Sequence, residues 1–531
     1  MRIKSLKTSK YKNLQNIDIR FDADLITLLV GENGLGKSNL IEIFTLIFKD
    51  LYTIQEKKDF IESAVKSELN DYVIEYECRG HNIKIDYHDE HINIYIENNK
   101  TYQIISFAEF KRNSNCFLPD RIMGYYSGEN KRIEGLLIDY IKKGKRAQQR
   151  AYKKGNINKR FRNIFITENK HSQLILFTLI LYWDHPEFRP AIDNVLCNVL
   201  EVDEMTGFEI VFNSPSFINL DKLKKSKTTL EYYIGEILST NDFNQFTDVD
   251  IFWGIRGDVD ALLRVLLFEY LGTPYCNIYE DNNKEYFSIN ENLLSYDTLV
   301  DKIYTVFPNP IDFFNALEAA SSIGMIDELN LKISKIGCED FYNFASLSEG
   351  EQQLISVLGF MAILKEDIDE VLYLIDEPDT HINPKWQRNY IQMLLDNIKN
   401  KRHRHMFIST HSPFLVQAYG ENVDILLFRK NEHKNIIIDK ADNTIKNWRI
   451  DQVLMSPYFN LASTRPSNID EFMERRLEII KRGEFSEEDK TKLKEYENEL
   501  GFLPTGETLL EVESMAYIAQ AAERYRKEKR I

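Results

Sequence analysis

The stretch Ile26–Phe44, ITLLVGENGLGKSNLIEIF, decides the fold of this chain. An apolar run leads into a loop from Gly31 to Ser38 that fits the pattern G-x-x-x-x-G-K-[ST], and apolar residues at helical spacing follow. The glycines of such a loop let successive backbone N–H groups turn inward and surround an anion. The positive end of the following helix adds to that attraction. The sequence therefore predicts a strand, an anion-binding loop and a helix in direct succession.

The phosphate chain of a nucleotide is the anion that suits this loop. Lys37 would supply a positive charge for the outer phosphates, and the Ser38 hydroxyl would bind Mg²⁺. We therefore predict that this loop binds a nucleotide together with Mg²⁺. The residues of this segment predicted to hold the nucleotide are Asn33, Gly34, Gly36, Lys37, Ser38 and Asn39.

A second apolar run, VLYLIDEP from Val371 to Pro378, ends in two carboxylates. Sheets of α/β proteins place ligands at the carboxyl ends of their buried strands, so both side chains are expected near the phosphates. Asp376 could hold Mg²⁺ through its water shell, and Glu377 could act as general base toward the attacking water. The alternative is an ordinary strand followed by an acidic turn.

A third short strand is expected in MFISTHSP, from Met406 to Pro413. His411 at its end could donate a hydrogen bond to a terminal phosphate and so respond to its loss. A lone histidine is more often structural, so this prediction depends on the other motifs.

The stretch SLSEGEQQL, Ser346 to Leu354, introduces another apolar-periodic helix. Ser348 with an acid three positions later, Glu351, predicts a capping box, and Gly350 lies between them. As helix chemistry alone, that interpretation is sufficient.

The run LSEGEQQ also resembles the signature motif of ATP-binding-cassette (ABC) ATPases. In that superfamily, the signature of one subunit contacts the γ-phosphate that the glycine loop of a second subunit holds. The resemblance implies that the nucleotide is ATP and that Ser348, Gly350 and Glu351 complete the site of a neighbouring copy, in a homodimer or a higher even oligomer. Four motifs in the expected order carry this resemblance, over about the first 130 residues and residues 335 to 440.

Other segments resemble particular branches of the superfamily. KYKNLQNIDIRF resembles the opening of RecF-like and overcoming-lysogenization-defect proteins, and no Toprim opening follows Ser412. DEPDTHINPKWQ resembles a run of defence-associated ATPases, in which Asp379, Thr380 and His381 would form the loop that crosses the dimer interface. Asn383 stands where that run usually has histidine.

YYSGENKR, Tyr125 to Arg132, together with NWRIDQVLMSPYF and STRP further on, resembles the ATPase subunits of Septu-type anti-phage systems, including the retron-associated form. In that family the ATPase works with a separate HNH nuclease. No glutamine stands where the γ-phosphate-sensing loop begins, and Ser127 or Glu129 would substitute for it.

The chain has 531 residues, of which 43% are hydrophobic, and a formal net charge of -16. A chain this acidic is not expected to coat DNA with its whole surface. The run Lys142–Arg162 contains no acid. It predicts either a solvated loop or helix, or a contact for nucleic acid or an acidic partner.

Cysteines and apolar runs indicate the compartment. The five cysteines are scattered without a CxxC pair, which fits a reducing cytoplasm. The longest apolar run, Leu174 to Trp183, is too short to span a bilayer, and no secretory segment follows the charged start. We expect a cytoplasmic protein that does not enter a membrane.

The predicted fold is α/β: an ABC-type ATPase head, formed by a P-loop α/β core and an antiparallel β subdomain, with a large mostly helical insertion and a helical C-terminal tail. The expected regions are an ATPase lobe with glycine loop and β-meander at 1–135, the insertion at 136–335, a lobe with signature, acidic strand and His411 at 336–450, and the tail at 451–531.

Three functions remain open. The leading hypothesis is a slowly hydrolysing ATPase that dimerises around ATP and controls a partner HNH nuclease in anti-phage defence. The alternative is a RecF-like DNA-repair ATPase that clamps DNA, for which the basic run is the best support. A nuclease in its own right is the weakest hypothesis, because no acidic metal cluster is seen beyond the ATP site.

Overall fold

The computed structural model describes residues 1–54, 62–63, 66–98, 101–127, 132–154, 163–167, 169–240, 249–291, 297–338, 340–364, 370–398, 404–417, 423–431, 433–440, 448–456, 458–459 and 461, and stretches between 474 and 521 that include 486–500. Glu129, the STRP run and residues 155–162 of the basic run lie outside the described residues. The chain divides into two compact units, Met1–Lys446 and Asn447–Ile531.

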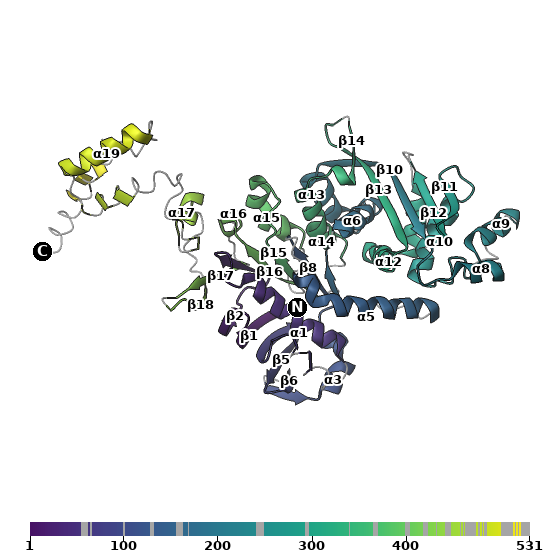
Figure 1. The fold of residues 1–531 in the computed structure, drawn as a ribbon, viewed down its shortest axis with the longest axis horizontal. Coiled ribbons are helices and arrows are strands. Elements are labelled where there is room, and N and C mark those ends of the chain that lie inside the picture. Colours follow the sequence, from purple (N-terminus) through teal and green to yellow (C-terminus); the bar gives the residue numbers. More distant parts are fainter. Residues whose placement is uncertain are drawn as a thin grey trace. The chain divides into compact units, whose positions relative to one another are not determined.

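A seven-stranded sheet forms the centre of the first unit (Figure 1). Its strand order is β18-β17-β3-β16-β15-β8-β9, and every neighbouring pair except β17 with β18 is parallel. The strands are β3 (Ile26–Gly31), β8 (Arg121–Tyr126), β9 (Ile164–Ile166), β15 (Val371–Asp376), β16 (Arg404–Thr410), β17 (Val423–Lys430) and β18 (Ile436–Lys440). All residues of β3, β15 and β16 are buried, as is typical of parallel strands covered on both faces. The strands predicted from the three motif-bearing runs are thus confirmed.

A second sheet, of six antiparallel strands, has the order β2-β1-β4-β5-β6-β7. Its strands are β1 (Arg2–Tyr11), β2 (Leu14–Arg20), β4 (Tyr72–Cys78), β5 (His81–His88), β6 (His91–Asn98) and β7 (Thr101–Ile105). Strand β4 alternates buried and half-buried residues along its length, which is the pattern of a sheet with one face on the core. The β-meander predicted between residues 70 and 106 is confirmed.

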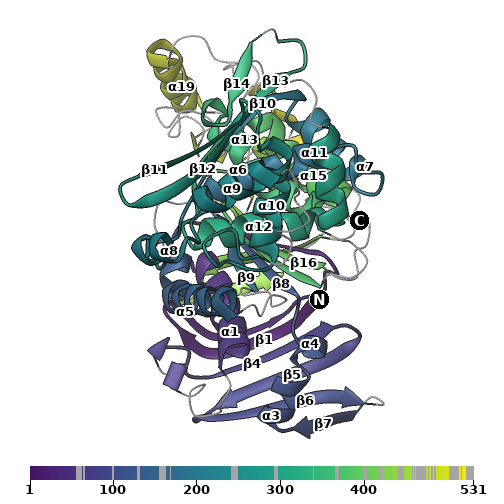
Figure 2. The same ribbon diagram turned by 90° about the vertical axis from the view of Figure 1, so that its right-hand side faces the viewer.

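Helix α1 (Lys37–Thr53) lies between these two sheets (Figures 1 and 2). Phe44 of α1 packs against Phe407 of β16 with ring centroids 4.6 Å apart. Phe48, one turn further on, contacts Tyr76 of β4 at 5.4 Å. Both faces of α1 are therefore buried, which fixes the glycine loop at the edge of the central sheet.

The region between β8 and the signature is mostly helical, as expected, but its strands also pair into a sheet that the sequence did not predict. It contains a five-stranded antiparallel sheet of order β11-β12-β10-β13-β14. The strands are β10 (Val202–Asn213), β11 (Cys276–Asp281), β12 (Lys284–Glu291), β13 (Ile326–Lys335) and β14 (Phe341–Asn343). The run GFEIVF lies within β10.

Helices make up much of the rest of the described residues. They are α3 (Phe107–Arg112), α4 (Ser114–Phe117), α5 (Arg132–Lys154), α6 (Asn169–Leu181), α7 (Arg189–Asp193), α8 (Leu220–Ser226), α9 (Leu230–Thr240), α10 (Asp258–Tyr270), α11 (Asp297–Val306), α12 (Pro310–Ser322), α13 (Glu349–Leu354), α14 (Phe360–Ala362), α15 (Pro384–Asp396) and α16 (Pro413–Gln417) in the first unit, and α17 (Ile450–Leu454) and α19 (Glu487–Leu500) in the second. Two π-helical segments, Asn194–Val199 and Ile355–Gly359, and a short 3₁₀ turn, Phe344–Ser346, complete the assignment. The apolar run that starts at Leu174 lies mostly in α6 and is buried. Within the described part of the chain, no helix has both the length and the hydrophobicity needed to cross a membrane.

Candidate nucleotide site

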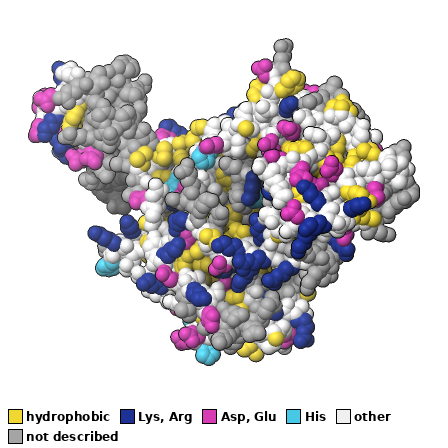
Figure 3. Space-filling view, turned by 45° about the vertical axis from the view of Figure 1, so that its right-hand side comes forward, with side chains coloured by type: hydrophobic (Ala, Val, Ile, Leu, Met, Phe, Trp, Pro, Cys, Tyr) yellow, Lys and Arg dark blue, Asp and Glu magenta, His cyan; other side chains and the backbone are white. Residues whose placement is uncertain are grey.

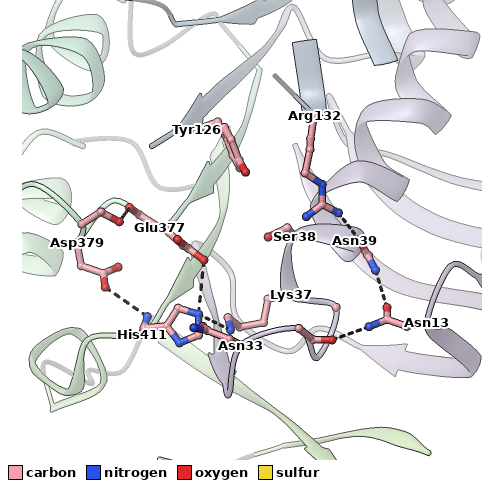
Figure 4. A pocket seen from close by; sticks show the side chains of 13 residues that line it. Asn13, Asn33, Lys37, Ser38, Asn39, Tyr126, Arg132, Glu377, Asp379 and His411 are labelled. Atoms are coloured by element: carbon pink, nitrogen blue, oxygen red, sulfur yellow. Dashed lines mark hydrogen bonds and ion pairs between the residues drawn. The ribbon is translucent and has the colours of Figure 1, made fainter. Parts of the chain in front are cut away.

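A cavity of about 630 Å³ opens where β3, β15 and β16 end (Figure 4). Strand β16 lies between β3 and β15 in the sheet, so the segments that follow these three strands meet at one edge. The cavity is lined by Asn13, Asn33, Gly34, Gly36, Lys37, Ser38, Asn39, Tyr126, Arg132, Glu377, Asp379, Thr380 and His411. The structure thus brings together the predicted loop residues, Glu377 and His411.

The glycine loop needs glycine at Gly36, directly before α1. Gly36 has a φ of 92°, in the left-handed region that side chains disfavour. A Cβ atom there would also lie 2.6 Å from Leu14 Cδ2 and 2.8 Å from Asn13 Oδ1. The turn between β1 and β2 therefore packs directly against the loop, and Asn13 Nδ2 donates a hydrogen bond to Gly34 O at 2.7 Å.

Lys37, the first residue of α1, is buried inside the cavity. Its Nζ donates to Gly31 O at 2.8 Å and to Glu32 O at 3.1 Å, and lies 2.8 Å from His411 Nε2. Burial lowers the pKa of Lys37 to about 8, against the opposing attraction of nearby carboxylates such as Glu377. A poorly hydrated cation whose hydrogen-bond partners are two backbone carbonyls and a histidine nitrogen is well prepared to bind phosphate oxygens.

Ser38 and Asp376, the two predicted metal ligands, lie next to each other. Ser38 Oγ donates to Asp376 Oδ1 at 3.0 Å, and Ser409 Oγ donates to the same oxygen. The other oxygen, Asp376 Oδ2, is buried and has no hydrogen-bond partner among the described residues. Burial raises the pKa of Asp376, against the opposing hydrogen bonds of the two serines.

These two residues fit Mg²⁺. A hydroxyl and a carboxylate supply the oxygen ligands that the ion prefers, and one buried carboxylate oxygen still lacks a partner. The described residues contain no cluster of three or more His, Cys, Asp or Glu side chains able to hold a metal. In nucleotide sites Mg²⁺ is held by one or two protein oxygens together with phosphates and waters, so Ser38 and Asp376 would suffice as its protein ligands.

Glu377, directly after β15, occupies the left-handed backbone region with a φ of 51°. Such a conformation is costly outside glycine and is found most often at functional sites. Glu377 Oε1 lies 3.5 Å from His411 Nε2, and this interaction lowers the pKa of the glutamate although burial opposes it. The backbone N–H of Glu377 is held by Ser409, so strand β16 fixes the position of the predicted base.

Asp379 connects the loop after β15 to the end of β16. Its Oδ1 accepts from Thr410 Oγ1 at 2.8 Å, and its Oδ2 accepts from the His411 N–H at 3.3 Å. Burial raises the pKa of Asp379, whereas the bond from Thr410 opposes this. A shift of this loop would therefore also displace His411.

The signature stretch lies apart from the other motifs. The capping box is confirmed: the Glu351 N–H donates to Ser348 Oγ at 3.3 Å, and the Ser348 N–H donates to Glu351 Oε2 at 2.8 Å. Lys335 forms an ion pair with Glu351 that holds the turn in place. Ser348 is exposed, and none of the three predicted signature residues is among those that line the cavity of its own chain.

The signature helix nevertheless contacts the loop that follows Glu377. A Cβ on Gly350 would lie 2.7 Å from His381 O, so this position must remain glycine for the two backbones to approach. Glu349 Oε2 lies 2.8 Å from His381 Nδ1. Asn383 has a structural role here: its Oδ1 accepts from the Trp386 N–H at 2.9 Å and caps α15.

Sequence reasoning missed Asn13, Tyr126 and Arg132 as cavity residues. Asn13 belongs to a β-turn, and only its spatial position beside Gly36 reveals its role. Arg132 is the last residue of YYSGENKR, a run that indicated a family resemblance but no cavity residue. Ser127, predicted as a substitute for the missing glutamine, does not line the cavity; its Oγ lies 3.2 Å from Thr380 Oγ1 instead.

Several known proteins are similar to this chain. The family model described as an AAA ATPase domain matches residues 1–416. Septu protein PtuA of Bacillus mycoides (strain KBAB4) is 26% identical over 238 residues, which is 42% of this chain and 33% of that protein. The probable ATPase of retron Ec83 from Escherichia coli is 24% identical over 247 residues, 44% of this chain and 41% of that one.

Two further comparisons are more distant or shorter. The probable ATPase of retron Vc95 from Vibrio cholerae serotype O1 biovar El Tor is 26% identical over 182 residues, 33% of this chain and 34% of that protein. The chain thus spans between a third and about two fifths of the length of these curated relatives. A crystal structure of an Smc head domain from Pyrococcus yayanosii aligns with a TM-score of 0.33 and 12% identity, over 83% of this chain and 97% of that one.

The family match covers the glycine loop, Glu377 and His411, which line the cavity, and Asp376, which contacts Ser38. This chain belongs to the AAA ATPase domain family, a family of ATP-hydrolysing enzymes.

Proposed function

We propose that the cavity beside Lys37 binds ATP with Mg²⁺, and that a second copy of the chain completes the site for slow hydrolysis. The observation that carries this proposal is the meeting of Lys37, Ser38 and Glu377 around one cavity, while Ser348 remains outside it. The cavity holds the loop, the cation and the base of a hydrolytic site, but not the signature residues that would face the terminal phosphate from the other side.

Each residue has a distinct part in this reaction. Lys37 releases its loop carbonyls and binds the outer phosphates, while the loop N–H groups surround them. Ser38 and Asp376 would hold Mg²⁺, which would supply positive charge to neutralise the phosphates. Glu377, ionised because its pKa is lowered, accepts a proton from the attacking water.

A mutant pair tests these roles. Glu377→Gln should retain ATP and accumulate a dimer, because binding remains and hydrolysis stops. Lys37→Ala should lose ATP, because the buried cation is gone. ATP retained on filters and mass from light scattering give both readouts; equal ATP retention by the two variants would contradict the assigned roles.

We further propose that this ATPase controls an HNH nuclease in anti-phage defence. The support is the similarity to a Septu protein and to two retron ATPases, together with the run YYSGENKR. The test is co-expression with an HNH-motif protein encoded by a neighbouring gene. The pair should co-purify, and Lys37→Ala should abolish protection against phage; normal protection by that variant would overturn this role.

Helix α5 supports a contact with nucleic acid, the one feature that favours the DNA-clamp alternative. Ile133, on the other face, is buried, whereas Lys142, Arg146 and Arg150 are exposed and four residues apart, about 6 Å along the helix axis. None of the three forms a hydrogen bond or ion pair with another described residue. Figure 3 shows Lys and Arg side chains gathered across the middle of one face of the molecule.

Neutralising these three residues tests that contact. The triple change Lys142→Gln, Arg146→Gln and Arg150→Gln should weaken DNA binding and reduce its dependence on salt, because phosphate contacts release counterions. Neutralising Lys222, Lys225 and Lys227, which lie exposed on and beside α8, is the matched control. Equal salt dependence in both triple variants would remove α5 as a nucleic-acid contact.

A further inference from the structure

Arg132, the first residue of α5, reaches the nucleotide cavity although no motif predicted it there. Figure 4 shows its guanidinium pointing toward Ser38 and Asn39, on the side of Lys37 opposite to Glu377 and His411. The cavity therefore has two polar ends, with Lys37 between them.

The guanidinium has few partners in the structure. Its Nη2 atom donates to Asn39 Oδ1 at 2.8 Å and lies 2.9 Å from Glu42 Oε1. Arginine carries five N–H donors, and both contacts use the same nitrogen. Arg132 makes no other hydrogen bond to a described residue, and 43% of its side chain is exposed. Several donors thus remain available to a ligand.

The charges around Arg132 do not balance. Glu42, of which only 1% is exposed, forms ion pairs with both Arg132 and Lys12, and also accepts a hydrogen bond from the Tyr11 hydroxyl at 2.9 Å. One buried carboxylate therefore faces two cations. The surplus positive charge at this end of the cavity favours an anionic ligand, and a guanidinium matches the oxygens of a phosphate particularly well.

The surroundings also hold Arg132 in place before any ligand arrives. Asn39 Nδ2 donates to Asn13 Oδ1, which in turn lies beside the glycine loop. The chain of contacts from Asn13 through Asn39 to Arg132 joins the β1–β2 turn, α1 and α5. A preorganised donor of this kind loses little entropy when it binds.

We propose that Arg132 is a nucleotide-binding residue that contacts the phosphates at the nucleoside end of the bound nucleotide. The inference rests on the proposed position of ATP in the Lys37 cavity. The terminal phosphate faces Glu377 and His411, so Arg132 lies at the other end, beside the first turn of α1. Arg132 therefore contacts ATP and ADP alike, and it links α5 to the bound nucleotide.

Arg132→Gln tests this assignment by direct titration with fluorescent ATP and ADP. The variant should weaken binding of both nucleotides by about tenfold to a hundredfold, because a charge-assisted hydrogen-bonded contact is lost. Arg132→Lys should restore part of the affinity by keeping the charge. Arg112→Gln, an exposed change at the end of α3, is the matched control and should bind like the unaltered chain.

Glu42→Gln separates a direct contact from a structural one. If Arg132 binds phosphate, freeing it from its carboxylate should leave nucleotide affinity unchanged or increased, whereas a purely structural cluster would lose affinity in both variants. Thermal melting of the nucleotide-free proteins checks that each variant folds.

Lys37→Ala distinguishes failure of this inference from failure of the proposed site. If Lys37→Ala retains full nucleotide affinity, the site itself is elsewhere. If Lys37→Ala loses affinity while Arg132→Gln retains it, the site stands and Arg132 is not a ligand. Loss of ATP binding with unchanged ADP binding in Arg132→Gln would move the contact to the terminal phosphate and overturn the assignment made here.

Discussion

Lys37 Nζ lies 2.8 Å from His411 Nε2, and that same nitrogen lies 3.5 Å from Glu377 Oε1. One histidine nitrogen thus faces a cation and an anion, and it cannot serve both in the same way. It accepts from Lys37 when it carries no proton, and it donates to Glu377 when it does. On the proposed function, phosphates would draw Lys37 away, and His411 would then be free to turn toward the base or the terminal phosphate.

The change His411→Ala should therefore separate binding from hydrolysis. Lys37 would keep its two loop carbonyls, so ATP affinity should change by less than about threefold. The turnover rate should fall by about one to two orders of magnitude, because a donor aimed at the reacting groups is lost. Nucleotide titration and phosphate release measure the two quantities, and a large loss of affinity with normal turnover would contradict this role.

ATP affinity should depend on pH through Lys37. Burial lowers the pKa of this amine to about 8, so in the free protein it loses its proton as the pH rises through that value. Bound phosphate favours the charged amine, so above about pH 8 affinity should fall by up to about tenfold per pH unit. Below about pH 8 the amine is already protonated and affinity should be flat.

Lys37→Arg is the control for this titration. Its guanidinium remains charged, so whatever affinity it retains should not change between about pH 7 and about pH 10. A wild-type curve that stays flat over the same range would show that the amine keeps its proton in the free protein.

Much of the nucleotide-binding core was predictable from local sequence. Local signals were sufficient: the spacing of the glycines, the apolar runs and the polar residues at the ends of these runs each span only a few positions. They correctly predicted that Lys37 follows the glycine loop and that Asp376 and His411 lie at strand ends. Parallel strands share one carboxyl edge, so motifs hundreds of residues apart could be expected to meet.

The sheet of the insertion could not be predicted in the same way. Strand β10 pairs with β13, whose residues lie more than a hundred positions further along the chain, and local periodicity contains no information on such a partner. A usable signal existed only in the β11–β12 hairpin, where Asn282 and Asn283 both have positive φ and form its two-residue turn.

Gly350→Ala should uncouple the signature helix from the loop after Glu377. The new methyl group would lie 2.7 Å from the carbonyl oxygen of His381, a backbone atom that cannot move alone. We expect a loss of about 1–3 kcal/mol in stability and a strong loss of hydrolysis, with nucleotide affinity of the chain's own cavity retained.

Gly135→Ala on α5 is the matched control for that change. A Cβ there meets nothing within 4 Å, and alanine is the better helix former, so stability should rise by about 0.5–1 kcal/mol. Chemical denaturation measures both variants. Equal effects of the two changes would show that the approach of Gly350 to His381 has no role.

Mixing two inactive variants tests whether Ser348 acts on a neighbour. Ser348 is exposed and lies outside the cavity that contains Lys37 of the same chain, so each site should need residues from two copies. Lys37→Ala and Ser348→Arg chains should each be inactive alone, because every site lacks one part. Mixed dimers contain one complete site, so an equal mixture should recover roughly a quarter of wild-type hydrolysis.

The control is a mixture of Lys37→Ala and Glu377→Gln, two changes in the same cavity. A mixed dimer of these two variants would contain a complete site only if Lys37 and Glu377 acted across copies. We expect this mixture to remain inactive, because Glu377 serves the same cavity as Lys37 and only Ser348 crosses the interface. One cavity of each mixed dimer then lacks its cation, and the other lacks its base. Activity of Ser348→Arg on its own would show that hydrolysis needs no partner copy.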